Sequence, residues 1–321
     1  MKDILRNIVD VIEKHQFFLV TSHVRLDGDA LGSELAMYHF LLHMGKDVVV
    51  YNEDETPGNY RFLPGSDKIV NNINNFDRFE VAIVLDCSEL ERVGKEFSRI
   101  IAIKNIINID HHFSNGKFGG FPYIDYEASS TGELIYRLLN AVDFDLTTDI
   151  ATNLFTAIFT DTGGFRYSVK KDTLVASGHL VEKGADPQWI SESIFESYPP
   201  SKIRLMSRVL DTLTFDWSKK VGYMIVLRNA LEETGATMEH TDGFVDIPRS
   251  IQGVEVSILF VELSDSCFKL SLRSKGRINV ERVAKAFGGG GHINAAACRI
   301  DGDLETVKRK VMDVMETGAE T

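Results

Sequence analysis

The stretch "NIINIDHHFSN" at residues 105–115 joins an apolar run to one carboxylate and two imidazoles. Asp110, His111 and His112 therefore follow directly on what reads as an interior β-strand. A single buried histidine is often a core residue whose hydrogen bonds are satisfied. Two adjacent histidines and an aspartate at a strand end are harder to explain by packing, so the pattern indicates a metal-binding or catalytic site.

Similar runs, apolar and then polar at the C-terminal end, recur in the first half of the chain. They cover residues 17–23, 47–52 and 81–87, and a stretch with helical periodicity covers 30–45. Apolar strands separated by helices predict a parallel α/β sheet with helices on both faces. Because ligands of such sheets bind beyond the carboxyl ends of the strands, polar residues at these ends are site candidates. These residues are His23, Asp86 and Asp110.

Chain length and a break in the helical pattern predict two domains. A chain of 321 residues is long for a single core. Helical patterns dominate residues 130–216 and are interrupted by "YPP" at 198–200. A smaller α/β unit follows a junction near 195–218. We expect an N-terminal catalytic domain over 1–195, a helical linker over 196–218 and a C-terminal substrate-binding domain over 219–321. The active site is expected in the cleft between the two domains.

Composition limits the possible binding partners and indicates the cellular compartment. The formal net charge of -12 disfavours binding to duplex DNA, but it does not exclude a small phosphorylated ligand in a local basic pocket. Cys87, Cys267 and Cys298 form no CxxC pair, so the sequence supports neither a disulfide framework nor a zinc knuckle and favours a cytoplasmic location. No stretch approaches the roughly 20 apolar residues of a membrane span. The amphipathic N-terminal segment has no continuous apolar core, so we expect no signal peptide.

Three further stretches place acidic residues at turns. "SHVRLDGDALGS" at 22–33 holds His23, Asp27 and Asp29 between a strand and a helix. Two carboxylates so close repel one another unless a cation lies between them, although a turn with a helix N-cap is the alternative. Asp86 in "IVLDCSE" and Asp161 in "FTDTGGFRYS" each read, in isolation, as a cap or a helix-ending turn.

Taken together, the four stretches supply more acidic groups than one metal ion needs. A pair of ions suits them better, with carboxylates as bridges and imidazoles as terminal ligands. Oxygen and nitrogen donors without thiolate favour Mn²⁺, with Mg²⁺, Co²⁺ or Fe²⁺ as alternatives and Zn²⁺ less favoured. Two such ions about 3.5–4 Å apart activate a shared water and clamp a phosphoryl oxygen. Hydrolysis of a phosphate ester is the reaction that such a site fits best.

With these four stretches the chain resembles the DHH phosphoesterase superfamily. "HVRLDGDALGS", "LDCSE", "IDHH" and "TDTGGFRYS" are similar to its four motifs, and they occur in the family's order. "FGGGGHINAAA" at 287–297 resembles the glycine-rich signature of the accessory domain that accompanies many members. The similarity is greatest to the branch of bacterial oligoribonucleases (nanoRNases) and pAp phosphatases. One departure is Arg25-Leu26 in the first motif, where the family usually has Pro before the DGD aspartate; no expected ligand is lost.

The resemblance implies roles for the residues of the four motifs. Asp86 and Asp161 are the implied bridges between two Mn²⁺ ions. Asp110 is implied to orient a histidine by hydrogen bonding, and His112 to face the scissile phosphate as a charge stabiliser or proton donor. The full set of implied metal ligands is His23, Asp27, Asp29, Asp86, His111 and Asp161.

The C-terminal domain is implied to hold the substrate. Consecutive glycines in "GGGGH" expose backbone N–H groups that bind phosphate, although a flexible turn is the alternative. In "SLRSKGR", Arg273 and Lys275 project from one face of a strand because side chains alternate. The candidate substrate-binding residues are Arg273, Ser274, Lys275, Gly288, Gly289, Gly290, Gly291 and His292.

The activity implied by the resemblance is that of an Mn²⁺-dependent exoribonuclease and 3′-nucleotidase. It would degrade short single-stranded RNA from the 5′ end to mononucleotides and hydrolyse 3′-phosphoadenosine 5′-phosphate (pAp) by two-metal activation of water, with a homodimer allowed. The alternative is a cyclic-dinucleotide phosphodiesterase acting on c-di-AMP or pApA. Inorganic pyrophosphatase, an exonuclease on longer single strands and a non-catalytic nucleotide sensor are less favoured. The sequence does not rank pAp, dinucleotides, longer oligomers and cyclic dinucleotides.

Overall fold

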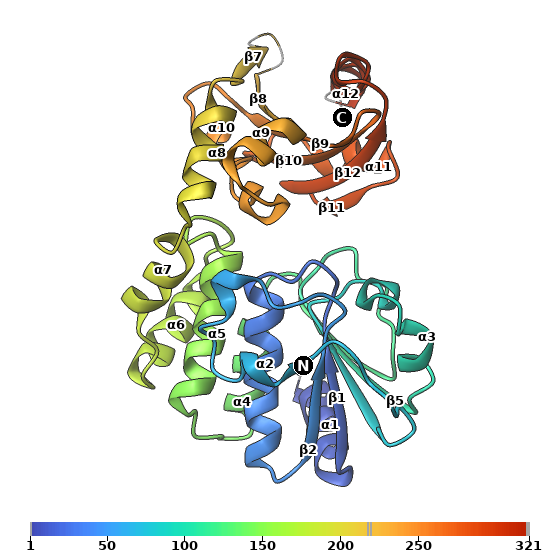
Figure 1. Cartoon of the computed structure of the whole chain (residues 1–321). Coiled ribbons are helices and arrows are strands. Elements are labelled where there is room, and N and C mark those ends of the chain that lie inside the picture. The colour runs from blue at the N-terminus through green and yellow to red at the C-terminus, as the bar shows by residue number, and fades with distance from the viewer. Residues whose placement is uncertain (1, 217, 219, 319–321) are drawn as a thin grey trace. The chain divides into compact units, whose positions relative to one another are not determined.

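The computed structural model describes residues 2–216, 218 and 220–318, and these residues form two compact units (Figure 1). The units divide between Ser197 and Tyr198. Each is built on a six-stranded sheet of its own. The predicted α/β class is confirmed.

All strand pairs in the first sheet are parallel, in the order β3-β2-β1-β4-β5-β6. Its strands are β1 (Phe17–Thr21), β2 (Asp47–Tyr51), β3 (Ile69–Val70), β4 (Val81–Leu85), β5 (Asn105–Asp110) and β6 (Phe121–Ile124). Sequence patterns did not predict β3, which is two residues long, or β6, which contains Pro122. Proline cannot donate a ladder hydrogen bond and is therefore confined to edge strands. β6 is such a strand, since it lies at the edge of the sheet.

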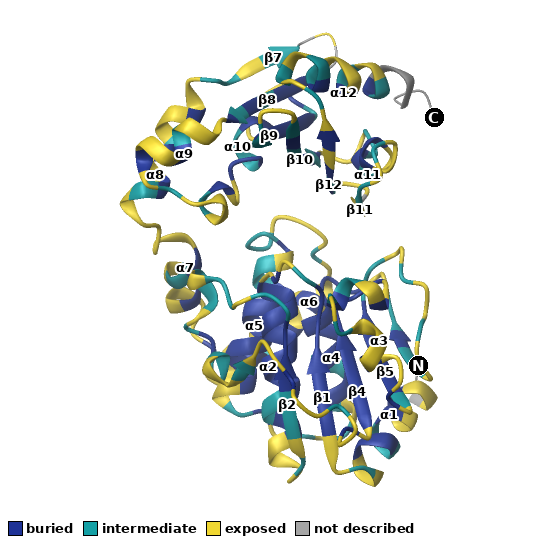
Figure 2. Cartoon of the chain, turned by 45° about the vertical axis from the view of Figure 1, so that its right-hand side comes forward, coloured by how far each residue is buried: buried dark blue, intermediate teal, exposed yellow. Residues whose placement is uncertain are grey.

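Side chains of the central strands alternate between two apolar layers. Figure 2 colours the central strands β1 and β4 as buried. Phe18 and Val20 of β1 face the main core, whereas Leu19 faces a smaller core on the opposite side. The main core is lined by α1 (Lys2–Lys14), α2 (Gly28–His43), α4 (Thr131–Ala141), α5 (Thr148–Asp161), α6 (Lys171–Glu182) and α7 (Pro187–Phe195). The opposite face is covered by the short helices α3 (Phe97–Ile100) and η3 (Leu90–Val93). Two further single turns are η1 (Gly58–Tyr60) and η2 (Ser66–Lys68).

Small residues let the N-termini of α2 and α4 approach the C-terminal half of α5. A Cβ atom at Gly28 would lie 2.4 Å from Oγ1 of Thr160, and one at Gly132 would lie 2.4 Å from Cβ of Ala157. Real side chains do not pack so closely, so any larger residue would separate these helices. The start of α2, the start of α4 and the end of α5 all carry polar residues, and the close packing brings these residues together.

The second unit is a mixed sheet in the order β11-β12-β10-β9-β8-β7, in which only β8 and β9 pair in parallel. Its strands are β7 (Thr214–Asp216), β8 (Val221–Val226), β9 (Val256–Ser264), β10 (Cys267–Ser274), β11 (Gly290–His292) and β12 (Ala295–Asp301). Its helices are α8 (Pro200–Leu210), α9 (Arg228–Thr234), η4 (Met238–Thr241), α10 (Asp246–Arg249), α11 (Val280–Lys285) and α12 (Leu304–Gly318). Sequence patterns did not predict β11 as a strand, because a glycine run carries no side-chain pattern that reveals strand pairing.

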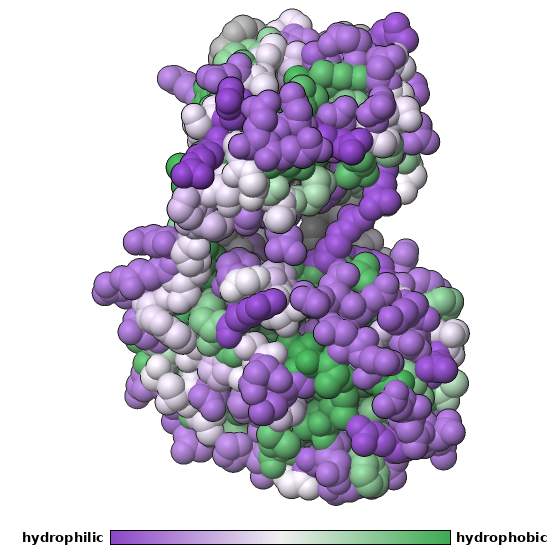
Figure 3. All heavy atoms as spheres, in the orientation of Figure 1, coloured by the Kyte–Doolittle hydropathy of each residue, from purple (hydrophilic) through white to green (hydrophobic). Residues whose placement is uncertain are grey.

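Hydrophilic residues cover most of the surface of each unit that is visible in Figure 3. Among the described residues, no helix combines the length and the apolar character needed to cross a bilayer.

Candidate metal centre

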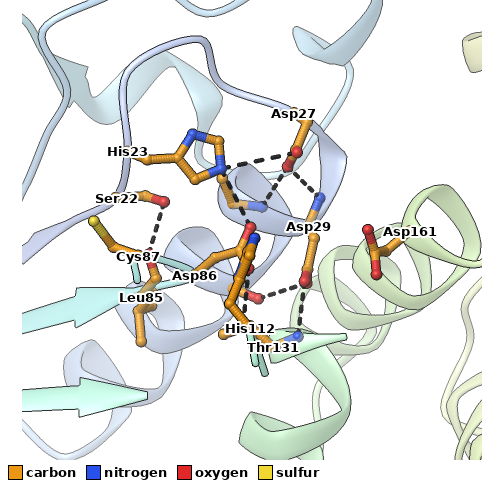
Figure 4. Close-up of polar contacts among 12 residues, drawn as sticks. Ser22, His23, Asp27, Asp29, Leu85, Asp86, Cys87, His112, Thr131 and Asp161 are labelled. Atoms are coloured by element: carbon orange, nitrogen blue, oxygen red, sulfur yellow. Dashed lines mark hydrogen bonds and ion pairs between the residues drawn. The ribbon is translucent and has the colours of Figure 1, made fainter. Parts of the chain in front are cut away.

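The acidic and histidine residues singled out from the sequence gather at the carboxyl edge of the first sheet (Figure 4). His23 stands two residues after β1, Asp86 follows β4 directly, and Asp110 is the last residue of β5. β1, β4 and β5 are neighbours, and the strand order reverses between β1 and β4. Such a reversal is the place where open α/β sheets bind ligands.

His23, Asp27 and Asp86 form the first group of candidate ligands. Nε2 of His23 lies 3.3 Å from Oδ2 of Asp86 and 3.8 Å from Oδ2 of Asp27. Nδ1 of His23 lies 2.9 Å from the carbonyl oxygen of Val24, which can only accept, so this nitrogen carries the proton. Burial disfavours the imidazolium, but the carboxylates of Asp86 and Asp27 raise the pKa of His23 to about 9.

Asp29, His111 and Asp161 form a second group. Nε2 of His111 lies 3.7 Å from Oδ2 of Asp29 and 3.5 Å from Oδ2 of Asp161. The start of α4 holds the Asp29 carboxylate, because the backbone N–H groups of Thr131 and Gly132 donate to it over 2.7 and 2.9 Å. Asp29 at the start of α2 and Asp161 at the end of α5 thus meet through the close helix packing described above.

Asp86, His111 and His112 form a third group, and within each of the three groups the ligand atoms lie within 4.8 Å of one another. Asp86 belongs to two groups, as expected of a bridging carboxylate, whereas Asp161 belongs to one. The bridging role of Asp161 stays a prediction.

The donor set fits divalent cations. Burial and neighbouring carboxylates raise the pKa of Asp29 well above its usual range. The same causes raise the pKa of Asp161 to about 6, although 34% of its side chain is exposed. Crowded carboxylates of this kind are stabilised by cations, and oxygen and imidazole donors without sulfur suit Mn²⁺ or Mg²⁺ better than soft metals.

Asp110 holds His112 in place, in the arrangement expected for an orienting residue. Its Oδ1 accepts a hydrogen bond of 2.7 Å from Nδ1 of His112, and its Oδ2 accepts one of 2.6 Å from Nδ2 of Asn115. Burial alone would raise the pKa of Asp110, but the hydrogen bond and the charge of His112 lower it. Burial also disfavours the charged form of His112. The carboxylates of Asp110 and Asp86 outweigh this effect and raise the pKa of the ring.

Asp86 is held in a left-handed backbone conformation, with φ of 51°. Aspartate tolerates this region better than most residues, but such positions still cost about 1–3 kcal/mol and persist only where the surrounding structure imposes them. The N–H of Asp86 donates to the carbonyl of Ile109 over 3.0 Å, and the hydroxyl of Thr131 donates to Oδ1 of Asp86 over 3.0 Å. Neighbouring elements therefore fix both the backbone and the carboxylate.

Sequence reasoning missed the residues that support the ligands. Ser130 is the N-cap of α4, and its hydroxyl accepts from the N–H of Glu133 over 3.1 Å. The next two residues, Thr131 and Gly132, hold Asp29 and Asp86, and Asn115 holds Asp110. The available signal was the helix start itself, because unpaired N–H groups there bind carboxylates.

In the second unit, Arg273, Ser274 and Lys275 lie at the end of β10, where burial alternates along the strand. The Ser274 side chain is buried and its hydroxyl donates to Oδ1 of Asn294 over 3.2 Å. Lys275 is exposed and its ammonium donates to the carbonyl of Ile251 over 3.3 Å. A substrate-binding role for these three residues stays a prediction.

Close backbone packing accounts for two of the four consecutive glycines. A Cβ atom at Gly289 would lie 2.2 Å from the carbonyl oxygen of Ala297, and one at Gly291 would lie 2.4 Å from that of Ala295. Both contacts are with β12, so these glycines allow the pairing of β11.

The other two glycines differ from one another. Gly288 has φ of +72°, which favours glycine. A Cβ atom at Gly290 would meet no described atom within 4 Å, so sterics within the chain do not require glycine there. The side chain of His292 lies outside the described part of the structure. Phosphate binding by this segment stays a prediction.

Comparison with known families assigns both units. The DHH family, N-terminal domain, matches residues 18–158, and the DHHA1 domain matches residues 219–317. The chain belongs to the DHH family, which confirms the resemblance seen in its motifs.

Two relatives define the similarity further. The bifunctional oligoribonuclease and PAP phosphatase NrnA of Thermus thermophilus is 31% identical over 299 residues, which cover 92% of this chain and 88% of that protein. The protein of the same name from Bacillus subtilis is 24% identical over 313 residues, covering 94% and 97%.

Two solved structures share the fold. An exopolyphosphatase-related protein of Bacteroides fragilis superposes with a TM-score of 0.94 at 28% identity, covering 99% of this chain and 96% of that one. RecJ of Thermus thermophilus in complex with Mn²⁺ gives a TM-score of 0.52 at 11% identity, covering 98% and 54%. The RecJ similarity shows a common fold and no more.

Proposed function

We propose that this chain is a metal-dependent phosphoesterase that degrades short single-stranded RNA from its 5′ end to mononucleotides and also hydrolyses pAp. The observation that carries the proposal is the convergence on one sheet edge of histidine and aspartate donors from α2, from α5 and from the segments that follow β1, β4 and β5. The names of the Thermus and Bacillus relatives support the class of substrate.

In this proposal the centre holds two divalent cations, with Mn²⁺ as the resident metal. His23, Asp27 and Asp86 would hold one cation, and Asp29, His111 and Asp161, together with Asp86, would hold the other. Bound divalent cations supply Lewis acidity and an activated water for attack on phosphorus.

The chain's own residues position the proton that the leaving group requires. Asp110 accepts a hydrogen bond from Nδ1 of His112 and, against the effect of burial, raises the pKa of the ring, which favours its protonated form. A protonated imidazole beside the scissile phosphate stabilises its charge and donates a proton to the departing oxygen. Residues 1–195 then carry the catalytic groups, and residues 219–321 bind the remaining phosphates of the substrate.

We further propose a cytoplasmic location and no duplex DNA partner. The net charge of -12 supports the second point, because like charges repel a long polyanion. Cys87, Cys267 and Cys298 are free thiols, which is compatible with a reducing compartment. A homodimer remains a prediction.

Substitution of Asp161 tests the proposal in the purified full-length protein. Initial rates with Mn²⁺ are measured side by side on pAp, on RNA of two to five residues and on cyclic di-AMP, before and after chelation. Asp161→Asn keeps the shape of the side chain but removes a ligand charge, and we expect the rate to fall by at least about 100-fold. Asp149→Asn, at the exposed start of the same helix, is the matched control. Full activity of Asp161→Asn, or turnover that persists without metal, would contradict the proposal.

A cyclic-dinucleotide phosphodiesterase is the second candidate. The cyclic-di-AMP phosphodiesterase PdeA of Listeria monocytogenes is 26% identical over 312 residues, which cover 91% of this chain but 46% of that protein. The same rate series separates the two functions. Faster turnover of cyclic di-AMP than of pApA and pAp would favour this candidate.

A further inference from the structure

Two exposed aromatic side chains adjoin the candidate metal centre. Phe113 is 80% exposed and Tyr126 is 59% exposed. Their rings meet edge to face, with centroids 5.5 Å apart and an interplanar angle of 74°. We propose that this pair is the platform on which the nucleobase next to the scissile phosphate stacks, an inference that rests on the proposed phosphoesterase function.

The chain itself places the pair beside the reacting groups. Phe113 directly follows His112, so their Cα atoms are about 3.8 Å apart. Tyr126 directly follows Asp125, whose N–H donates to the carbonyl oxygen of Asp110 over 3.2 Å. Both aromatic residues therefore project from the carboxyl edge of β5 and β6, where the candidate ligands lie.

The segment that carries Phe113 is anchored. The backbone N–H of Asn115 donates to the carbonyl of His112 over 3.1 Å, and its side chain donates to Asp110 over 2.6 Å. The N–H of Gly116 donates to the carbonyl of Ser88 over 3.2 Å. These hydrogen bonds hold the turn that carries Phe113, and the turn keeps its side chain exposed.

The segment that carries Tyr126 is anchored as well. The carboxylate of Asp125 accepts a hydrogen bond of 2.8 Å from the Arg137 guanidinium and one of 3.0 Å from the N–H of Glu127. Lys170 forms an ion pair with Glu127. Both rings are therefore presented by turns that charged and polar contacts hold in place, which lowers the entropy lost when a ligand binds.

An exposed phenylalanine beside the candidate metal centre contributes little to folding stability, because its ring stays in contact with water. In an edge-to-face pair one ring offers only its edge to the other, so ring faces remain for a ligand. Every nucleobase has a π face, and stacking on an aromatic side chain tolerates any base. The platform would therefore make the enzyme select substrates with a nucleobase next to the scissile phosphate, without selecting their sequence.

A comparison of substrates with and without a base tests the inference. The variants are Phe113→Ala and Tyr126→Ala, with Phe113→Trp as the rescue and Phe97→Ala, an exposed phenylalanine on α3, as the matched control. For pApA and pAp we expect Phe113→Ala to raise KM about 10-fold with kcat nearly unchanged, and Phe113→Trp to restore it. For ribose 3,5-bisphosphate, which has no base, we expect no change in kcat/KM. Equal losses on both kinds of substrate, or no loss on either, would overturn the inference.

A binding measurement provides a readout that does not depend on turnover. The indole introduced by Phe113→Trp should be quenched when adenosine 5′-monophosphate is added and not when ribose 5-phosphate is added. The signal is corrected for the 2 native tryptophans with the unsubstituted protein. Quenching by both ligands or by neither would refute stacking. A lower sedimentation coefficient of Phe113→Ala would instead assign the pair to contact between two copies of the chain and would refute the inference too.

Failure of the inference and failure of the proposed function give different results. If the unsubstituted protein cleaves pApA and Phe113→Ala does so equally well, only the platform is wrong. If the unsubstituted protein cleaves no phosphate ester with any divalent metal, the proposed function is wrong, and the quenching experiment still decides whether a base binds at Phe113.

Discussion

Asp27 uses its two carboxylate oxygens for two different purposes. Oδ1 accepts from the N–H groups of Asp29 and Ala30 over 3.1 and 3.0 Å and so caps α2. Oδ2 faces His23 at 3.8 Å, as a candidate metal ligand. The sequence presented a cap and a ligand as alternatives, but a carboxylate has two acceptor atoms and can satisfy both.

Glu34 is a fully buried carboxyl group that sequence reasoning did not single out. Its Oε2 accepts a hydrogen bond of 2.8 Å from Nδ2 of Asn52. Neither its Oε1 nor Oδ1 of Asn52 has a hydrogen-bond partner among the described residues. Burial raises the pKa of Glu34 to about 8.

Glu34 should therefore make the stability of the metal-free protein depend on pH. Because the folded state raises the pKa from an ordinary 4.5 to about 8, the stability associated with the bound proton is fully present below pH 4.5. It declines as pH rises towards 8, by at most about 1.4 kcal/mol per pH unit, and is constant above 8. Glu34→Gln cannot titrate, so we expect a smaller decline in its free energy of unfolding.

Urea unfolding in the presence of a chelator, at a series of pH values from about 5 to 9, measures this difference. Glu55→Gln is the matched control, because the Glu55 side chain is 84% exposed. Parallel pH profiles for Glu34→Gln and the unsubstituted protein would show that Glu34 is ionised in the folded state.

At the scale of elements, the meeting of three helix ends decides the geometry of the centre. Asp29 stands at the start of α2, Thr131 at the start of α4 and Asp161 at the end of α5. The helices predicted over these segments are confirmed. Their mutual distances depend on glycine contacts such as Gly132 with Ala157, and no periodicity reveals which helices touch.

Gly132→Ala tests the importance of this packing. The new methyl group would overlap Cβ of Ala157, so we expect a loss of about 1–3 kcal/mol in stability and weaker Mn²⁺ binding, since the start of α4 holds Asp29. Gly178→Ala is the matched control: Gly178 is exposed on α6, with no atom within 4 Å of its added Cβ. The control should gain about 0.5–1 kcal/mol, as usual for alanine in a helix.

Urea unfolding gives the two stabilities, and a Mn²⁺ titration gives the affinities. If Gly132→Ala behaved as the control does, the close approach of α4 and α5 would not be required for the centre.

At the scale of the whole molecule, the two units have separate apolar cores. Those of the first unit include Phe18 and Leu19, and those of the second include Val256 and Leu259. All candidate metal ligands lie in the first unit, whereas the predicted phosphate-binding residues lie in the second. We therefore expect metal to stabilise the core of the first unit and the remaining phosphates of the substrate to stabilise that of the second.

Mn²⁺ alone should protect the first unit and leave the second unchanged. Binding stabilises the folded state by about 2.7 kcal/mol at a metal concentration 100 times Kd, and this gain applies to the unit that holds the ligands. Hydrogen exchange followed by mass spectrometry should show slower exchange in residues 81–112 and no change in 256–274. Asp161→Asn is the control that should lose the protection. Equal protection of both segments would show that the two units unfold together.

The sequence by itself determined the α/β class, the four polar stretches and the chemistry of their side chains. It did so because apolar runs that end in polar residues identify strand ends, and parallel strands bring such ends to one edge. Only the tertiary structure decided which atoms meet. His111 and His112 are neighbours in the chain, yet His111 faces Asp29 and Asp161, whereas His112 is bound by Asp110. Local patterns carry no information on such contacts, because distances of a few ångströms between remote segments are set by how helices pack, at positions such as Gly28 and Thr160.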